Sequence, residues 1–144
     1  MIEQDTIKLL RECDAGIRMG ISSIDDLLKY TSSGELRKVL TGCRTSHDQL
    51  QSDINDQLRR FHDDGKEPGA MAKGMSWLKT NMKLAADDSD ATVADLITDG
   101  CNMGIKSLSR YLNQYKAADE HSKNLAKRLI HSEEKLVTDV RRFL

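Results

Sequence analysis

The chain has 144 residues, and its 22 basic residues nearly balance 23 acidic ones, which leaves a net charge of −1. A chain of this length forms one domain with a sizeable core, since it buries about 70% of the surface that its unfolded form exposes. The balanced charge argues against a general nucleic-acid binder, for which a pI above about 9 is typical. No apolar run reaches the roughly eighteen residues that a membrane span needs, so the sequence predicts no membrane association.

The N-terminus and the cysteines indicate a cytoplasmic protein. Residues 1–10, MIEQDTIKLL, lack the basic stretch followed by an apolar stretch that marks a signal peptide. The three cysteines, Cys13, Cys43 and Cys101, are far apart and form no Cys-x-x-Cys pair. An odd number of scattered cysteines is typical of a protein whose thiols stay reduced.

The composition and the apolar spacing predict an all-α fold. The chain has a single proline and few aromatic residues, and Val and Thr are scarce, which disfavours a β-sandwich or barrel. A first helix is expected at about 5–30, where apolar residues recur every three or four positions and Asp14 fills one slot. A second is expected at about 33–62, with His47 in the apolar stripe and a capping box of Ser32 and Glu35 at its start.

The second half of the chain repeats this arrangement after a long connection. Residues 63–90 hold the only proline, in a loop over 63–69, and methionines at helical spacing predict a short helix at about 70–86. This methionine stripe is expected to pack on the bundle, and a partner-binding groove is the alternative. Ser89 or Asp90 is expected to cap a third helix at about 91–115, and a fourth follows at about 119–143, with Asp119 in a cap.

These elements predict a single domain over 1–144 that is an antiparallel four-helix bundle of two helical hairpins. Short connections make the two helices of each hairpin antiparallel. About 25 residues of helix span roughly 37 Å, and the connection over 63–90 is long enough to return that distance. Short matches between the hairpins, around Cys13 and Cys101 and around Leu50 and Leu136, indicate an internal repeat in which His47 corresponds to Glu133.

Each long helix carries one polar or soft residue in its apolar stripe, namely Asp14, His47, Cys101 and Glu133. Counted from the turns, all four fall within about one helical turn of a common layer, and Cys43 lies one turn from His47. Two carboxylates and a neutral imidazole suit one divalent transition metal, Fe, Mn or Zn, bound by Asp14, His47 and Glu133 with Cys101 and Cys43 nearby. The alternative, which we favour because isolated polar residues are common in bundle cores, pairs Asp14 with Arg18 or Arg44 and His47 with Glu133.

The two hairpins, the long connection with its Gly65–Gly69 loop and Trp77, and the polar residue on each helix resemble the ferritin-like four-helix proteins. The nearest resemblance is to small uncharacterised bacterial families of that fold. Catalytic members carry a Glu on the first and third helices and a Glu-x-x-His on the second and fourth. In this chain Arg44 precedes His47 in place of that Glu, and Ile130 and Glu133 occupy the Glu and His positions of the last helix.

The resemblance implies a bundle that has lost its di-iron site, because too few bridging carboxylates remain. We therefore expect a non-catalytic protein with an interaction or stress-associated role. The first alternative is a single-metal-binding protein, and the second is a thiol-based redox sensor in which Cys13 and Cys101 lie close together. A homodimer is expected, because ferritin-like bundles often pair side by side.

Overall fold

The computed structural model describes residues 2–63 and 89–144, and these residues form four long α-helices and no β-strand. The helices are α1 (Ile2–Leu28), α2 (Gly34–Arg60), α5 (Asp90–Gln114) and α6 (Glu120–Val140), and a 3-10 turn, η2 (Arg141–Phe143), follows α6. All four expected long helices are confirmed, with ends shifted by a few residues. The short helix expected at about 70–86 lies outside the described residues.

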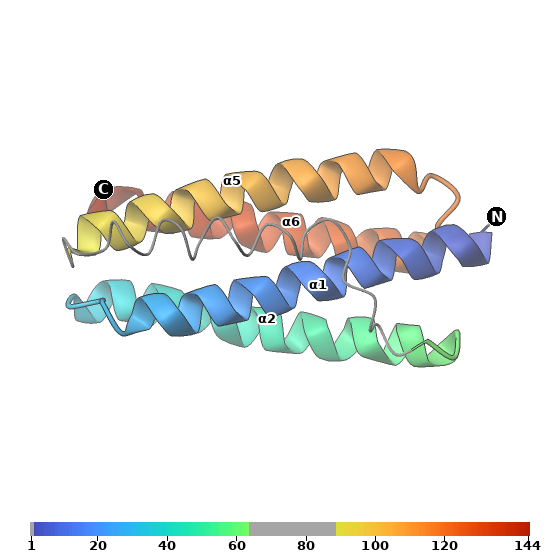
Figure 1. Ribbon diagram of the computed structural model, residues 1–144, viewed down its shortest axis with the longest axis horizontal. Coiled ribbons are helices and arrows are strands. Elements are labelled where there is room, and N and C mark those ends of the chain that lie inside the picture. The colour runs from blue at the N-terminus through green and yellow to red at the C-terminus, as the bar shows by residue number, and fades with distance from the viewer. Residues whose placement is uncertain (1, 64–88) are drawn as a thin grey trace.

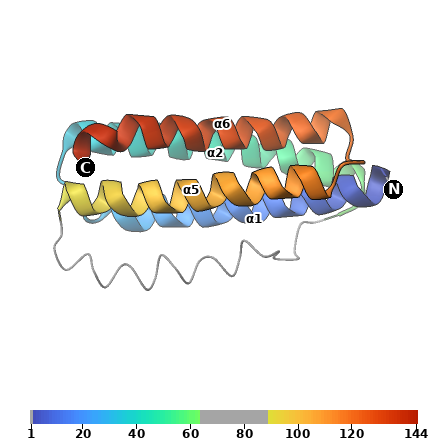
Figure 2. The same ribbon diagram turned by 90° about the horizontal axis from the view of Figure 1, so that it is seen from above.

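Helices α1 and α2 form one hairpin, α5 and α6 form a second, and the two hairpins lie side by side (Figures 1 and 2). Hydrogen bonds at the ends of the bundle fix the helix directions. At one end, the side-chain carboxylate of Asp90, the first residue of α5, accepts hydrogen bonds from the backbone N–H groups of Ser32 and Ser33 at 2.8 and 3.0 Å. At the other end the Asp119 N–H donates to the Thr6 hydroxyl at 2.8 Å. Helix α5 therefore starts where α1 ends, so these neighbours run in opposite directions.

Side-chain caps explain where the helices begin. Helix α2 is capped by Ser33, whose hydroxyl accepts from the Leu36 N–H at 3.2 Å. The expected capping box of Ser32 and Glu35 is therefore wrong by one residue, because the Ser32 N–H is held by Asp90 instead. Such a cap satisfies a backbone donor that has no partner within the helix.

The other two helix starts match the expectations from the sequence. The Ser89 hydroxyl accepts from the Thr92 N–H at 3.1 Å at the start of α5. At the start of α6 the Asp119 carboxylate accepts from the Ser122 N–H at 2.7 Å. Ser89 is thus the N-cap of α5, one of the two residues expected there, and Asp119 caps α6 as expected.

The core consists of two apolar clusters, one toward each end of the bundle. On every helix the two clusters are separated at the same height, where the buried His47 of α2 and Glu133 of α6 lie. The buried face of α1 differs from the apolar stripe that the helical spacing predicts. Leu9, Cys13 and Leu27 are fully buried, whereas Ile7, Ile21 and Leu28 are half-buried. The fold thus places the layer of His47 and Glu133 between two apolar clusters.

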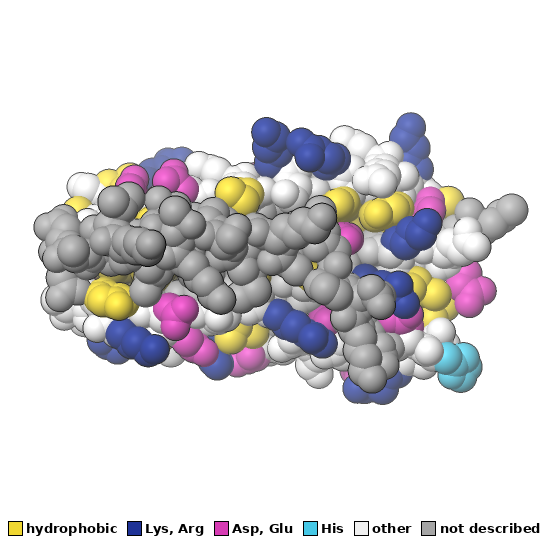
Figure 3. All heavy atoms as spheres, in the orientation of Figure 1, with side chains coloured by type: hydrophobic (Ala, Val, Ile, Leu, Met, Phe, Trp, Pro, Cys, Tyr) yellow, Lys and Arg dark blue, Asp and Glu magenta, His cyan; other side chains and the backbone are white. Residues whose placement is uncertain are grey.

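The surface carries charges of both signs. The face in Figure 3 shows basic and acidic side chains interspersed over the described helices rather than gathered in one patch. This distribution agrees with the net charge of −1. No helix within 2–63 or 89–144 has the length and apolar character needed to cross a membrane.

Candidate functional site

The polar layer is built on a pair between His47 and Glu133. The imidazole Nε2 of His47 lies 3.5 Å from the Oε1 atom of Glu133, and the two side chains are 2% and 11% exposed. Each residue occupies an apolar slot of its own helix, and α2 and α6 pack against each other in the bundle. The alternative in which His47 contacts Glu133 directly is therefore confirmed.

The second ring nitrogen of His47 faces Cys43, one helical turn earlier on α2. Nδ1 lies 3.1 Å from the Cys43 carbonyl oxygen and 3.6 Å from the Cys43 Sγ atom. Burial lowers the pKa of His47, but hydrogen bonds to the Cys43 sulfur and to the Glu133 carboxylate outweigh it and raise this pKa to about 10. An imidazolium donates from both ring nitrogens, and here both face acceptors, so the geometry suits the charged form.

Two glycines make room for these buried polar side chains. A Cβ atom on Gly20 of α1 would lie 3.0 Å from His47 Cδ2, and one on Gly104 of α5 would lie 3.3 Å from Glu133 Oε2. Each member of the pair thus packs against a glycine on the other helix of its hairpin, His47 of α2 against α1 and Glu133 of α6 against α5. Glycine in a helix interior costs about 1 kcal/mol relative to alanine, so such positions call for a packing reason.

Sequence reasoning missed these glycine seats. The available signal was the spacing of the glycines, since Gly16 and Gly20 on α1, and Gly100 and Gly104 on α5, stand four residues apart in otherwise regular helices. Four residues is about one helical turn, so each pair lies on one face of its helix.

A cavity of about 40 Å³ lies beside the pair, between α1 and α5. His47, Glu133 and Cys101 line it together with all four of these glycines and apolar side chains of α1 and α5. Its volume is enough for one or a few water molecules. Burial and the neighbouring Glu133 carboxylate raise the pKa of the Cys101 thiol, which keeps this thiol protonated.

Asp14 is set apart from this layer. Its carboxylate Oδ2 lies 2.9 Å from an Arg18 guanidinium nitrogen, while Arg44 bonds Asp25 instead. Burial raises the pKa of Asp14, and Arg18 and then Gln51 act to lower it. Asp14 precedes Gly20, the seat of His47, by six residues, or about 9 Å along α1. Of the two pairings expected for Asp14, the structure has the one with Arg18.

The candidate metal ligands are therefore only partly grouped. His47, Glu133, Cys43 and Cys101 interact with one another, and Asp14 is bound elsewhere. Among the residues that the structure describes, no three His, Cys, Asp or Glu side chains are arranged to hold a metal ion. Metal binding stays a prediction from the sequence.

The cysteines of the sensor hypothesis lie at different heights. Cys13 belongs to one apolar cluster and Cys101 to the other. Since α1 and α5 run in opposite directions, the register set by their end contacts separates the two residues by about 13 Å along the bundle. Burial, followed by the nearby Glu12 and Asp14 carboxylates, raises the pKa of the Cys13 thiol to about 12. All three cysteines are free thiols.

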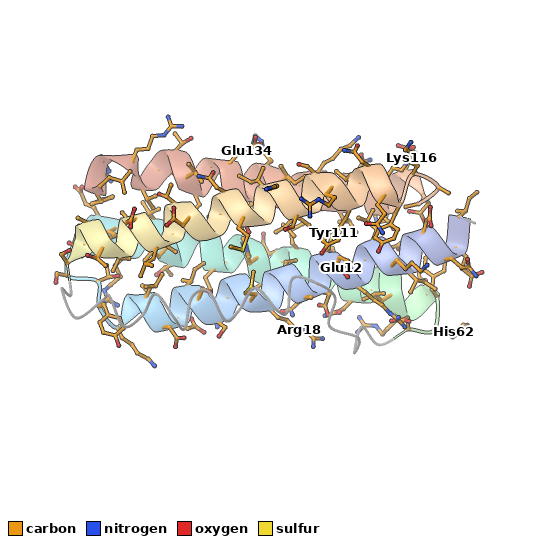
Figure 4. The ribbon with its side chains drawn as sticks, turned by 45° about the horizontal axis from the view of Figure 1, so that its top comes forward. Glu12, Arg18, His62, Tyr111, Lys116 and Glu134 are labelled. Carbon is orange, nitrogen blue, oxygen red and sulfur yellow. The ribbon has the colours of Figure 1, made fainter. Side chains whose placement is uncertain are left out.

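A third buried carboxylate, that of Glu12, was not singled out from the sequence. In Figure 4 it extends from α1 toward Tyr111 of α5, whereas Arg18 points away from the bundle. Glu12 is 8% exposed and Tyr111 is 7% exposed. Burial and the Glu12 carboxylate raise the pKa of Tyr111 to about 12. The Tyr111 phenol therefore stays protonated.

Comparison with known proteins finds no match: no family model fits the chain, and no curated protein or solved structure is significantly similar to it.

Proposed function

We propose that this protein is a non-catalytic helical bundle with ferritin-like connectivity, in which a histidine–glutamate ion pair occupies the layer that holds the di-metal centre in catalytic relatives. The observation that carries this proposal is the His47–Glu133 contact, seated on Gly20 and Gly104. An imidazolium beside a carboxylate neutralises the buried charge without a metal ion.

The donor set supports a layer without a di-metal centre. Such a centre in this fold uses carboxylates from all four helices together with histidines. Among the described residues, Glu133 is the one carboxylate that contacts His47. Asp14, the carboxylate of α1 expected at this height, is bound to Arg18.

The helix directions support the ferritin-like connectivity. Helix α2 ends near the start of α1, where Asp63 contacts Arg11 at 3.1 Å, and α5 begins at the opposite end of the bundle, at Asp90. This is the separation that a ferritin-like crossover bridges. We favour a role as an interaction or stress-associated protein that forms a homodimer, for which sedimentation equilibrium is the test.

The experiment is a metal-loading assay on untagged protein. The protein is incubated with Fe(II), Mn(II) or Zn(II) in turn, desalted, and measured by elemental analysis and by thermal melting. We expect well below one metal ion per chain and an unchanged melting temperature. Stoichiometric metal would contradict the proposal.

The same assay identifies the alternative of a single-metal protein, which is favoured by the approach of His47 and Glu133 to Cys43 and Cys101. In that case His47→Ala abolishes the bound metal. His131→Ala is the matched control, because His131 is an exposed histidine on α6. Retention of metal by the control and loss in His47→Ala would establish the alternative.

A further inference from the structure

The thiol of Cys43 begins a chain of three interacting side chains. Its Sγ atom lies 3.6 Å from His47 Nδ1, and His47 Nε2 lies 3.5 Å from Glu133 Oε1. A nucleophile, an imidazole and a carboxylate in this order form the arrangement by which proteins activate a thiol. The carboxylate orients the ring, and the protonated ring stabilises the thiolate by its charge.

Among the three cysteines, Cys43 is the one in a position to react. It is partly exposed, whereas Cys13 and Cys101 are 0% and 6% exposed. The two buried thiols are held protonated, and a protonated thiol is a poor nucleophile. The sequence hypothesis of a thiol sensor named Cys13 and Cys101, whereas the partly exposed thiol that contacts an imidazole is that of Cys43 on α2.

A cavity adjoins Cys43 between α2 and α6. Its volume is about 70 Å³, and its polar lining includes Ser132, whose hydroxyl lies 4.0 Å from the Cys43 sulfur. The other lining residues are Val39, Ser46, Lys135, Leu136 and Asp139. One water molecule occupies about 30 Å³ in the liquid, so a molecule of two or three heavy atoms fits. The lysine ammonium and the serine hydroxyl supply hydrogen-bond donors for an oxygen-rich guest.

We infer that Cys43 is a modification site for small peroxides, which enter this cavity and meet the Cys43 sulfur beside the His47–Glu133 pair. The sulfur attacks one peroxide oxygen, so an S–O bond forms while the O–O bond breaks. The sulfur loses two electrons to the peroxide and becomes a sulfenic acid. The departing hydroxide takes up the thiol proton and leaves as water.

This inference goes beyond the proposed function and does not depend on it. It needs only the contacts among Cys43, His47 and Glu133 and the adjoining cavity, whether or not the bundle is related to the ferritin-like proteins. His47 and Glu133 are positioning residues in this scheme, because neither bonds to the peroxide oxygen that is transferred.

The test uses the full chain, reduced and treated with EDTA so that no metal contributes. Hydrogen peroxide is added at pH 7 with dimedone as the sulfenic-acid trap, and peptide mass spectrometry follows each cysteine over time. We expect Cys43 to be trapped at least about tenfold faster than Cys13 or Cys101. We also expect it to react faster in the folded chain than in the chain unfolded in guanidinium. Equal rates in the folded and unfolded chains, or faster trapping at either buried cysteine, would overturn the inference.

Variants separate activation from mere exposure. His47→Gln is expected to slow trapping at Cys43 by about tenfold or more, and Glu133→Gln by a smaller factor. Glu134→Gln is the matched control, because Glu134 lies on the outer side of α6 (Figure 4) and is exposed. Circular dichroism checks the fold of each variant. If His47→Gln unfolds, the test rests on the trapping rate at Cys43 in Glu133→Gln and on the comparison between folded and unfolded wild type. An unchanged Cys43 rate in the folded variants would refute the role of the pair.

Discussion

Replacing Gly20 with alanine tests the seat of His47 directly. The new Cβ atom would lie 3.0 Å from His47 Cδ2 and 3.1 Å from Nε2, which is tighter than most Cβ contacts in proteins, so the ring would have to shift slightly. His47 is 1% exposed and has apolar clusters on both sides, so the space open to its ring is the cavity of about 40 Å³ that it lines together with Gly20. A shift of the ring would also lengthen its contact with Glu133, which is already 3.5 Å.

The size of the effect follows from two opposing contributions. Alanine is about 1 kcal/mol better than glycine in a helix interior. Overpacking a dense core costs about 1–3 kcal/mol. Gly20→Ala should therefore lower the free energy of unfolding by up to about 2 kcal/mol, or leave it unchanged if the ring shifts easily. Gly42→Ala, on the exposed face of α2 with open space around its Cβ, should raise it by about 1 kcal/mol.

The assay is urea denaturation followed by far-ultraviolet circular dichroism, with both variants and the wild type measured side by side. The quantity of interest is the difference between the two variants, which removes the common propensity gain and should be about 1–3 kcal/mol. If Gly20→Ala stabilises the protein as much as Gly42→Ala does, His47 is not packed against Gly20 and the reasoning fails.

Three further substitutions probe the buried and capping charges. Glu133→Gln leaves the His47 imidazolium without its carboxylate and should lower the free energy of unfolding by about 3 kcal/mol near pH 6, measured by urea denaturation. A loss of under about 0.5 kcal/mol, as is typical of an exposed residue, would refute the His47–Glu133 ion pair. Asp14→Asn removes a carboxylate whose pKa is raised by burial, so ionisation of Asp14 opposes folding above the pKa of the unfolded chain. The melting temperature of this variant at pH 7 should equal or exceed that of the wild type, and a fall of several degrees would contradict the prediction. Asp90→Ala removes the acceptor of two backbone N–H groups between the hairpins and should cost about 1–2 kcal/mol, with faster amide exchange at Ser32 as the check.

The sequence predicted the elements that depend on local pattern. Helical spacing located all four long helices, and side chains that cap helices located the starts of α5 and α6 at Ser89 and Asp119. The start of α2 was missed by one residue, because Ser32 and Ser33 are equally good caps. Both serines also donate their backbone N–H groups to Asp90 of α5, which is a tertiary contact at this turn. A local rule contains no information about that contact.

The candidate site was predictable in its members and in the His47–Glu133 contact, but not in the height of Asp14. Polar residues in apolar stripes identified His47 and Glu133, whose contact the structure has. Asp14 was placed in the same layer because heights counted from turns carry an error of about one helical turn. Its partner, Arg18, lies on the same helix, so the carboxylate needs no neighbour from another helix. The contacts of Gly20 with His47 and of Gly104 with Glu133 were missed, because a glycine has no side chain whose chemistry points to a site.

The central claim is that a charged His47 is held between Cys43 and Glu133. Burial lowers its pKa, but the bonds to these two residues raise it from 6.5 in the unfolded chain to about 10. Because the folded-state pKa is the higher one, the stabilisation is complete below about pH 6.5 and is lost as the pH rises through about 10.

The most direct measurement is a nitrogen–proton NMR titration of the imidazole rings, with His47→Gln used to assign the His47 signal. We predict that both ring nitrogens of His47 stay protonated at pH 8. A His47 ring that is neutral at pH 8, with a pKa at or below 6.5, would contradict the account.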